Sequence, residues 1–178
     1  MNTRPPAPGG LALVESLVNS LDVETGADLL DTVEGRAGFG LAEEEVPGAR
    51  VLREALRAAC LAHTGVQVRG RSAADLDLLL ARAPLRVGVD GEGVAALRAA
   101  GAPDALLSRV ALAIAEAVAD GTWGRLKACE AEDCQWAFYD RSPAGRGRWC
   151  VMSVCGARAK MRAYRARLTE GEGPAPRP

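Results

Sequence analysis

Four of the chain's five cysteines fall within 27 residues in the pattern C-x4-C-x15-C-x4-C, formed by Cys129, Cys134, Cys150 and Cys155. Two close pairs separated by a spacer of hairpin length can place four thiolates at the corners of a tetrahedron, as a structural Zn²⁺ site requires. Two disulfides are the alternative. The N-terminus shows no charged start followed by an apolar stretch, so we expect no secretory signal and a reducing compartment, which disfavours disulfides. The pattern therefore predicts a zinc site.

The segments around the cysteines predict a small finger. Residues 136–139 form a short aromatic strand, residues 148–150 are its expected return strand, and residues 140–147 between them are rich in turn formers. A helix follows, and its first turn carries Cys155. A cysteine knuckle, a hairpin and a helix in this order are typical of a treble-clef-like zinc finger. Because so small a unit buries little surface, metal binding is expected to supply most of its folding energy.

The charge of the chain is divided along its length. Residues 1–120 carry 11 Lys and Arg against 17 Asp and Glu, whereas residues 121–178 carry 11 against 6. Between Arg141 and Arg167 there are eight basic residues and no acidic one. An acidic body followed by a basic arm suggests a polyanionic partner for the arm, although runs of charge are more often just solvated surface.

The helix after Cys155 concentrates this basic charge. At about 100° per residue, its apolar residues share one stripe, which we expect to pack on the hairpin aromatics: Ala157, Met161, Tyr164 and Leu168. Both flanks of the stripe are basic, with Arg158, Arg162 and Arg165 on one and Lys160 and Arg167 on the other. Cations at this spacing can meet successive phosphates or guanine edges, so we expect DNA contacts from these five residues, together with Arg146 and Arg148. In the alternative, some arginines neutralise the −2 charge of a four-thiolate zinc site, with Arg158 the first candidate.

The residues before the finger predict a mostly helical body. Apolar spacing favours helices over 11–21, 49–63, a segment opened by Ser72, and 103–120, with Pro103 in a first helical position. A short segment from Asp28 is expected to break at Gly35, Gly38 and Gly40. Alternation favours a β-hairpin over 85–98, although its second strand also suits a helix. The fold class is therefore mainly α (α+β), with a flexible N-terminus at 1–10, a helical domain at 11–121, a finger at 122–168 and a disordered tail at 169–178.

No catalytic site is visible in the body. His63 is the single histidine, and both it and Cys60 extend the apolar stripe of the second predicted helix, so we interpret His63 as a core-edge histidine and Cys60 as a small buried hydrophobe. The chain has no Gly-rich phosphate loop, no Ser/His/Asp set and no metal-binding carboxylate cluster. A four-thiolate zinc site leaves no position open for water, so we do not expect an enzyme. The longest apolar run is far too short for a membrane span, and we expect a soluble, cytoplasmic protein.

The finger closely resembles the CGNR zinc-finger family in residues 129–142, 148–152 and 155–160. The body resembles the family's N-terminal part more loosely, through its LVNSLD (17–22) and LREALR (52–57) segments. Members join a helical ABATE domain to this finger, so the resemblance implies an ABATE-like domain at 11–121 and a stress-induced bacterial transcription regulator. The Asn that names the family is Ala157 in this chain. Position 157 lies on the predicted buried stripe, where Ala fits, so we expect zinc binding and fold to persist.

Three functions remain open at this point. The first is a zinc-dependent DNA-binding regulator whose body senses an unidentified small molecule or forms a homodimer. The second is a protein-interaction module whose finger docks on an acidic partner or on its own acidic body. The third is RNA binding, in which Trp136, Phe138 and Tyr139 stack on bases, although these aromatics are better suited to a core.

Overall fold

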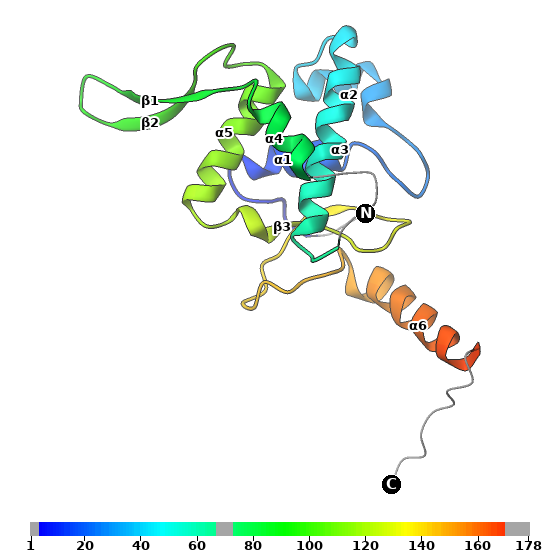
Figure 1. The fold of residues 1–178 in the computed structure, drawn as a ribbon. Coiled ribbons are helices and arrows are strands. Elements are labelled where there is room, and N and C mark those ends of the chain that lie inside the picture. The colour runs from blue at the N-terminus through cyan, green and yellow to red at the C-terminus, as the bar shows by residue number, and fades with distance from the viewer. Residues whose placement is uncertain (1–3, 67–72, 170–178) are drawn as a thin grey trace.

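Within residues 4–66 and 73–169, which the computed structural model describes, the chain forms six α-helices and two small antiparallel sheets (Figure 1). Five helices and the first sheet make up the N-terminal body, and the second sheet and the last helix make up the cysteine-rich segment. This arrangement confirms the predicted mainly α fold. Among the described helices, none is long and apolar enough to cross a membrane.

Three helices build the core of the body: α1 (Leu11–Val18), α3 (Val46–Ala62) and α5 (Leu106–Ala119). Their apolar spacing predicts all three, and the predicted stripes are buried, with Val14, Leu56 and Val110 wholly inaccessible to solvent. Gly10, just before α1, lets the backbone approach α5 closely, since a Cβ on it would lie 2.7 Å from the Ala113 Cβ. The predicted core of the body is therefore confirmed.

Two helix starts differ from the prediction. α3 begins three residues earlier than expected, because the glutamate-rich 3₁₀ turn Glu43–Glu45 leads straight into it and Pro47 fits its first turn. α5 begins at Leu106, because residues 103 and 104 form a separate turn, so the predicted first-turn role of Pro103 is wrong.

The helix α2 (Val33–Phe39) runs through Gly35 and Gly38, where the sequence predicts a break. That prediction is wrong because Thr32 caps the helix, its Oγ1 accepting a hydrogen bond from Gly35 N at 3.0 Å. Gly40 does end the helix, with φ +68° in the left-handed region. The two helical glycines differ in their surroundings. A Cβ on Gly35 would lie 1.9 Å from the Leu29 carbonyl oxygen, whereas Gly38 faces open space.

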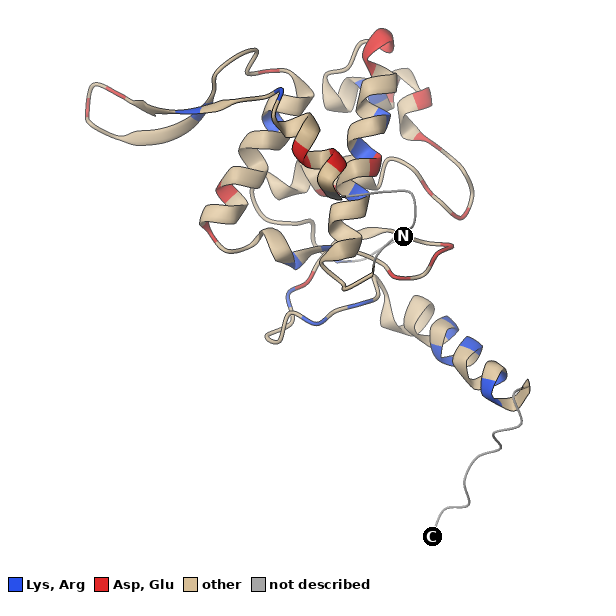
Figure 2. Cartoon of the chain, viewed as in Figure 1, with Lys and Arg blue, Asp and Glu red and all other residues tan. Residues whose placement is uncertain are grey.

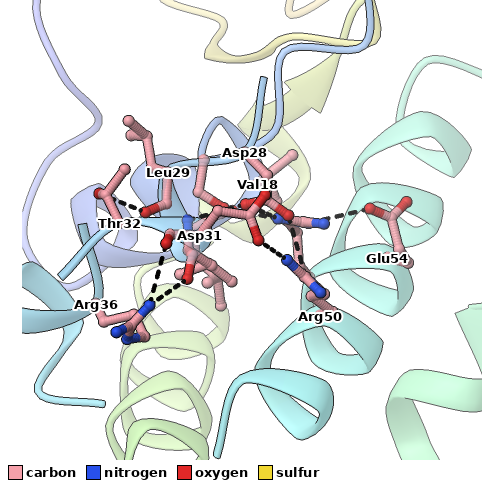
Figure 3. Close-up of polar contacts among 12 residues, drawn as sticks. Val18, Asp28, Leu29, Asp31, Thr32, Arg36, Arg50 and Glu54 are labelled. Carbon is pink, nitrogen blue, oxygen red and sulfur yellow. Dashed lines mark hydrogen bonds and ion pairs between the residues drawn. The ribbon is translucent and has the colours of Figure 1, made fainter. Parts of the chain in front are cut away.

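An ion-pair network joins α3 to the loop before α2, as Figure 3 shows. Asp28 lies at its centre, where its carboxylate accepts hydrogen bonds from Arg53 Nη1 at 2.8 Å and Arg50 Nε at 3.1 Å. Burial alone would raise the pKa of Asp28, but hydrogen bonds from Arg53 and the Leu30 N–H lower that pKa below its usual value. The network thereby holds Arg53, a charged residue that is 3% exposed, inside the core.

A β-hairpin extends sideways from the body beside α5 (Figure 1). It consists of β1 (Leu85–Val89) and β2 (Ala95–Ala99), which confirms the predicted hairpin. Its second segment is a strand and not a helix. The hairpin follows α4 (Ala73–Leu80), whose Leu76 is buried as predicted. The predicted capping residue Ser72 lies outside the described residues.

The cysteine-rich segment begins after α5 and contains β3 (Leu126–Ala128), β4 (Ala137–Tyr139) and α6 (Ala157–Thr169). A single π-helical turn, Met152–Gly156, precedes α6. Figure 1 shows the strands beneath the body and α6 pointing away from it. The metal-ligand candidates therefore lie between the body and a projecting helix.

The two glycines of α2 give opposite expected effects. Gly35→Ala should lower the free energy of unfolding by about 1–3 kcal/mol, because the new methyl group overlaps the Leu29 carbonyl. Gly38→Ala should raise it by about 0.5–1 kcal/mol, because alanine favours the helix and its methyl group meets no atom. Urea unfolding of both variants beside the wild type measures the difference. Equal shifts in the two variants would contradict the packing at Gly35.

Candidate metal centre

The hairpin β3–β4 lies between the core of the body and the four cysteines. Its strands pair from Leu126↔Tyr139 to Ala128↔Ala137. Because side chains alternate across a strand, Ala137 and Tyr139 join the core of the body, whereas Phe138 joins a second core with the cysteines. The hairpin is thus buried on both faces, and Phe138 and Tyr139 have no free ring face on which bases could stack.

The partner of β4 differs from the prediction. Residues 148–150 are not a strand, and β4 pairs with β3 upstream of the cysteines instead. β3 is the better partner because Leu126 and Ala128 both bury their side chains in the core of the body. Residues 148–150 still return beside the first cysteine pair, where Glu130 N donates to Arg148 O at 3.1 Å.

The first cysteine pair forms a tight knuckle. Cys129 N donates to Trp136 O at 2.9 Å, and the N–H groups of Cys134 and Gln135 both donate to Ala131 O, at 2.9 and 3.0 Å. Gln135 has φ +50°, a left-handed conformation that is uncommon for a residue with a side chain. The reversal at Gln135 carries the chain from the knuckle directly into β4.

The second pair is placed by the turn before α6. Cys155 lies in the π-helical turn Met152–Gly156, and its N–H donates to Val151 O at 2.9 Å. Gly156 is closely surrounded, since a Cβ there would lie 2.3 Å from Met152 Sδ and 3.2 Å from Trp149 Cδ1, and the Met152 side chain would have to shift. The prediction that a helical turn carries the last ligand is confirmed, and α6 starts directly after it.

The four sulfur atoms of Cys129, Cys134, Cys150 and Cys155 all lie within 4.8 Å of one another. Cys134 Sγ is 3.6 Å from Cys150 Sγ, which is 3.7 Å from Cys155 Sγ. A disulfide requires a sulfur separation of about 2.05 Å, whereas a tetrahedron with metal–sulfur bonds of about 2.3 Å has edges of about 3.8 Å. The four cysteines are therefore arranged to bind one metal ion, and Cys129, Cys150 and Cys155 are buried.

The protonation of the cluster also fits a cation. Hydrogen bonds from the thiols of Cys134 and Cys150, with backbone N–H groups of Cys150 and Ala131, lower the pKa of Cys129. The same contact with Cys129 raises the pKa of Cys134, and burial raises that of Cys155. These hydrogen bonds favour the thiolate form of Cys129. A divalent cation supplies the positive charge that four adjacent thiolates require.

Asn19, just after α1, clamps the cysteine-rich segment to the body. Its Nδ2 donates to Ala137 O at 3.0 Å, and its Oδ1 accepts from Ala137 N at 2.7 Å. The side-chain amide thus pairs with β4 as a neighbouring strand would.

Arg57 of α3 makes a second link, and its side chain is completely buried. Its Nη1 donates to Gln135 O at 2.9 Å and its Nη2 to Val18 O at 2.7 Å, so one guanidinium binds both α1 and the knuckle. His63 adds a third link, with Nδ1 2.7 Å from Leu126 O and its ring edge against Trp123. The pKa of His63 is lowered by burial. Cys60 is fully buried and His63 is half-buried, which confirms the predicted core cysteine and core-edge histidine.

Apolar periodicity does not identify Asn19 or Arg57 as links between the two halves, because their side chains are polar. The sequence does single out both residues in another way, because Asn19 and Arg57 lie in the LVNSLD and LREALR segments that resemble the family. The buried hydrogen bonds give a physical reason for those two segments.

A salt bridge fixes the loop at 140–147. Lys127 Nζ, from β3, lies 3.2 Å from Asp140 Oδ2 and donates to Gly147 O at 3.3 Å. Asp140 also accepts from Gly147 N at 2.7 Å. Burial would raise the pKa of Asp140, but the hydrogen bonds from Ser142, Gly147 and Lys127 lower it. The loop therefore holds Arg146 exposed at a fixed place.

The stripe on α6 is exposed, which corrects the prediction that it packs on the hairpin. Met161, Tyr164 and Leu168 are 50%, 51% and 48% exposed, and α6 contributes no buried residue. The face of the hairpin that the stripe was expected to cover is occupied by the cysteines and Trp136 instead. Ala157 is exposed as well, so the prediction that it is buried is wrong.

The seven candidate DNA-contact residues are all exposed, and Figure 2 shows the blue Lys and Arg positions repeating along the ribbon of α6. Three of the seven form ion pairs with carboxylates. Arg158 Nη1 lies 3.3 Å from Glu24 Oε1, Arg162 Nη1 lies 3.8 Å from Asp133 Oδ2, and Arg148 Nη2 lies 2.5 Å from Glu130 Oε2. The structure gives Arg146, Lys160, Arg165 and Arg167 no ion pair among the described residues. Arg158 contacts carboxylates, so the idea that it neutralises the cysteines is not supported.

Comparison with known proteins agrees with this geometry. The model of the CGNR zinc-finger family matches residues 125–168, which span β3, the four cysteines and almost all of α6. No curated protein matches the chain.

The metal centre makes a prediction about stoichiometry. The wild type should hold one divalent metal ion per chain, and Cys155→Ser should lose it, because three thiolates and a hydroxyl no longer close the tetrahedron. Elemental analysis after gel filtration, with a colorimetric thiol-displacement assay, measures the metal. Cys60→Ala is the matched control: its thiol is buried in the body with a pKa raised to about 12 by burial, and its loss should leave the metal bound. Metal retained by Cys155→Ser would contradict the site.

The clamp at Asn19 makes a separate prediction. Asn19→Ala removes both side-chain hydrogen bonds to Ala137 and should lower the free energy of unfolding by about 2 kcal/mol. The exchange rate of the Ala137 amide hydrogen should rise, whereas metal content should stay at the wild-type value. Hydrogen exchange followed by NMR reads that amide directly. An Ala137 amide as protected as in the wild type would show that Asn19 does not hold it.

Proposed function

We propose that the bound metal is Zn²⁺ and that the chain is a DNA-binding transcription regulator whose α6 contacts DNA. Four cysteine ligands in a closed, largely buried tetrahedron suit a structural zinc ion and leave no position for substrate. The observation that carries the proposal is α6, a projecting helix with five cations, no acid and no buried residue.

The charge of α6 supports a polyanionic ligand. Arg158, Arg162 and Arg165 lie at spacings of four and three residues along one flank. Asp133 lies 3.9 Å from Arg158 and 3.8 Å from Arg162, whereas no carboxylate of the described residues offsets the repulsion between Arg162 and Arg165. Such repulsion is relieved when phosphates lie beside the helix. Because the helix begins directly after Cys155, the metal would fix its direction relative to the body.

The body contributes the second half of the proposal. Its LVNSLD and LREALR segments resemble an ABATE domain, and in that family the implied role is stress-responsive regulation. We infer that the body senses an effector or dimerises, and that the links through Asn19 and Arg57 pass its position to the finger.

The exposed stripe on α6 favours one alternative, a protein-interaction module. Met152 and Val154, in the turn just before α6, are 59% and 44% exposed, so exposed apolar residues also occur beyond the helix. An acidic, amphipathic partner would fit this stripe and its basic flanks together. Binding to duplex DNA decides between the two functions.

The contact with phosphates predicts a steep salt dependence. If about five phosphates are neutralised, affinity for duplex DNA should fall by about two to three orders of magnitude between 50 and 200 mM salt. Arg165→Ala should reduce the slope of log K against log salt by about 1, with metal content unchanged. Fluorescence anisotropy with a labelled duplex measures both quantities, and a single-stranded RNA of equal length tests the alternative nucleic acid.

Arg82→Ala is the matched control for that measurement. Arg82 is exposed on the body, so its loss removes the same charge and should leave the slope unchanged. A slope that Arg165→Ala does not alter, or that Arg82→Ala alters equally, would contradict a DNA contact by α6.

A further inference from the structure

The hairpin β1–β2 exposes an apolar face. On that face Leu85, Val87 and Val89 of β1 oppose Ala99, Leu97 and Ala95 of β2, so every side chain is apolar. Val87 and Val89 are 67% and 66% exposed. A two-stranded sheet is marginally stable in water by itself, and further strands hydrogen bonded to its edge would stabilise it.

The outer edge of β1 offers backbone groups for such a strand. Asp90 N donates to Val94 O at 3.1 Å and Ala100 N donates to Pro84 O at 2.9 Å, so the even-numbered residues of β1 hydrogen bond to β2. In an antiparallel pair, the intervening residues point their N–H and C=O outward. Those residues are Leu85, Val87 and Val89, and within the described chain these outward groups have no hydrogen-bond partner. Figure 1 shows β1 on the side of the hairpin away from α5.

The opposite face of the hairpin carries its charges in a self-complementary order. Arg86 and Arg98 face each other across the strands, and both side chains reach over Gly88, where a Cβ would lie 2.7 Å from Arg98 Nε and 3.3 Å from Arg86 Nη1. Like charges opposed in this way destabilise a sheet. The described residues provide no carboxylate for either guanidinium. Asp90 and Glu92 lie at the tip of the same hairpin.

A second copy of β1 fits these features in one register. If two β1 strands pair antiparallel about a twofold axis at Gly88, Arg86 of each copy lies opposite Asp90 of the other. Val87 then lies opposite Val89 of the other copy, and these are the residues whose N–H and C=O point outward. The two Gly88 residues meet at the axis, where neither contributes a side chain of its own and the Arg86 and Arg98 side chains lie over one face.

We propose that β1 pairs with β1 of a second copy of this chain, forming a four-stranded antiparallel sheet across a homodimer. The apolar faces of the two hairpins join into one surface, and two Arg86–Asp90 pairs set the register. This interface lies on the body and is independent of nucleic acid, so its failure would leave DNA binding by α6 untouched.

Sedimentation equilibrium of the full, metal-loaded chain without DNA tests the proposal. The wild type should sediment as a dimer that dissociates on dilution. Val87→Pro should be monomeric at the same concentrations, because it removes an outward N–H while every hydrogen bond between β1 and β2 remains. Val87→Thr keeps that N–H and should remain dimeric. Unchanged metal content and circular dichroism would show that the variants are folded.

A second pair of variants tests the register. Arg86→Gln should raise the dimer dissociation constant about two- to thirtyfold, since both cross-copy ion pairs are lost. Arg82→Gln removes the same charge from an exposed position on the body outside the hairpin and should leave the constant unchanged. A monomeric wild type, a dimeric Val87→Pro or a monomeric Val87→Thr would overturn the strand pairing. Equal effects of Arg86→Gln and Arg82→Gln would overturn the register.

Discussion

One buried guanidinium connects the two halves of the molecule. Arg57 is wholly inaccessible to solvent, and it donates both to a carbonyl at the end of α1 and to the carbonyl of Gln135 in the cysteine knuckle. A buried charge and buried carbonyl groups cost free energy when they have no hydrogen-bond partner. The Arg57 guanidinium of the body and the Gln135 carbonyl of the knuckle therefore satisfy each other. Gln135, whose carbonyl accepts the hydrogen bond from Arg57, is also the residue whose left-handed conformation turns the knuckle into β4. The hairpin β3–β4 then places its side chains in both cores, and the direction of α6 follows from the position of Cys155.

The sequence predicts those parts of the molecule whose physics is local. The spacing of four cysteines identifies the metal-binding set, and apolar periodicity identifies α1, α3 and α5. Asp90-Gly91 between alternating residues identifies the β1–β2 hairpin. What periodicity cannot supply is the choice of partner. β4 pairs with β3 rather than with residues 148–150, because β3 also completes the core of the body. Asn19 and Arg57 carry no apolar signal, although their hydrogen bonds link the two halves.

In the C-terminal helix α6 the local apolar pattern is present, but the contact predicted from it is not. Its stripe of Met161, Tyr164 and Leu168 has the spacing of a buried face, yet the surface it was expected to cover is already filled by the cysteine core. Its amphipathic pattern therefore describes a surface without a partner in this chain. A helix with exposed apolar residues between two basic flanks, held at one end by a metal site, is suited to contact an external polyanion. The hairpin β1–β2 has the same character on the other side of the body, where an apolar face and an open strand edge suit a second copy.

The central claim is that the metal-held α6 is the surface that meets DNA. NMR amide-shift mapping of the metal-loaded chain, titrated with a short duplex, tests this claim most directly. The account predicts that the largest shifts fall on residues 157–169 and on the loop at Arg146, and that the hairpin β1–β2 is unperturbed. Shifts concentrated on the body, or no shifts at low salt, would contradict it.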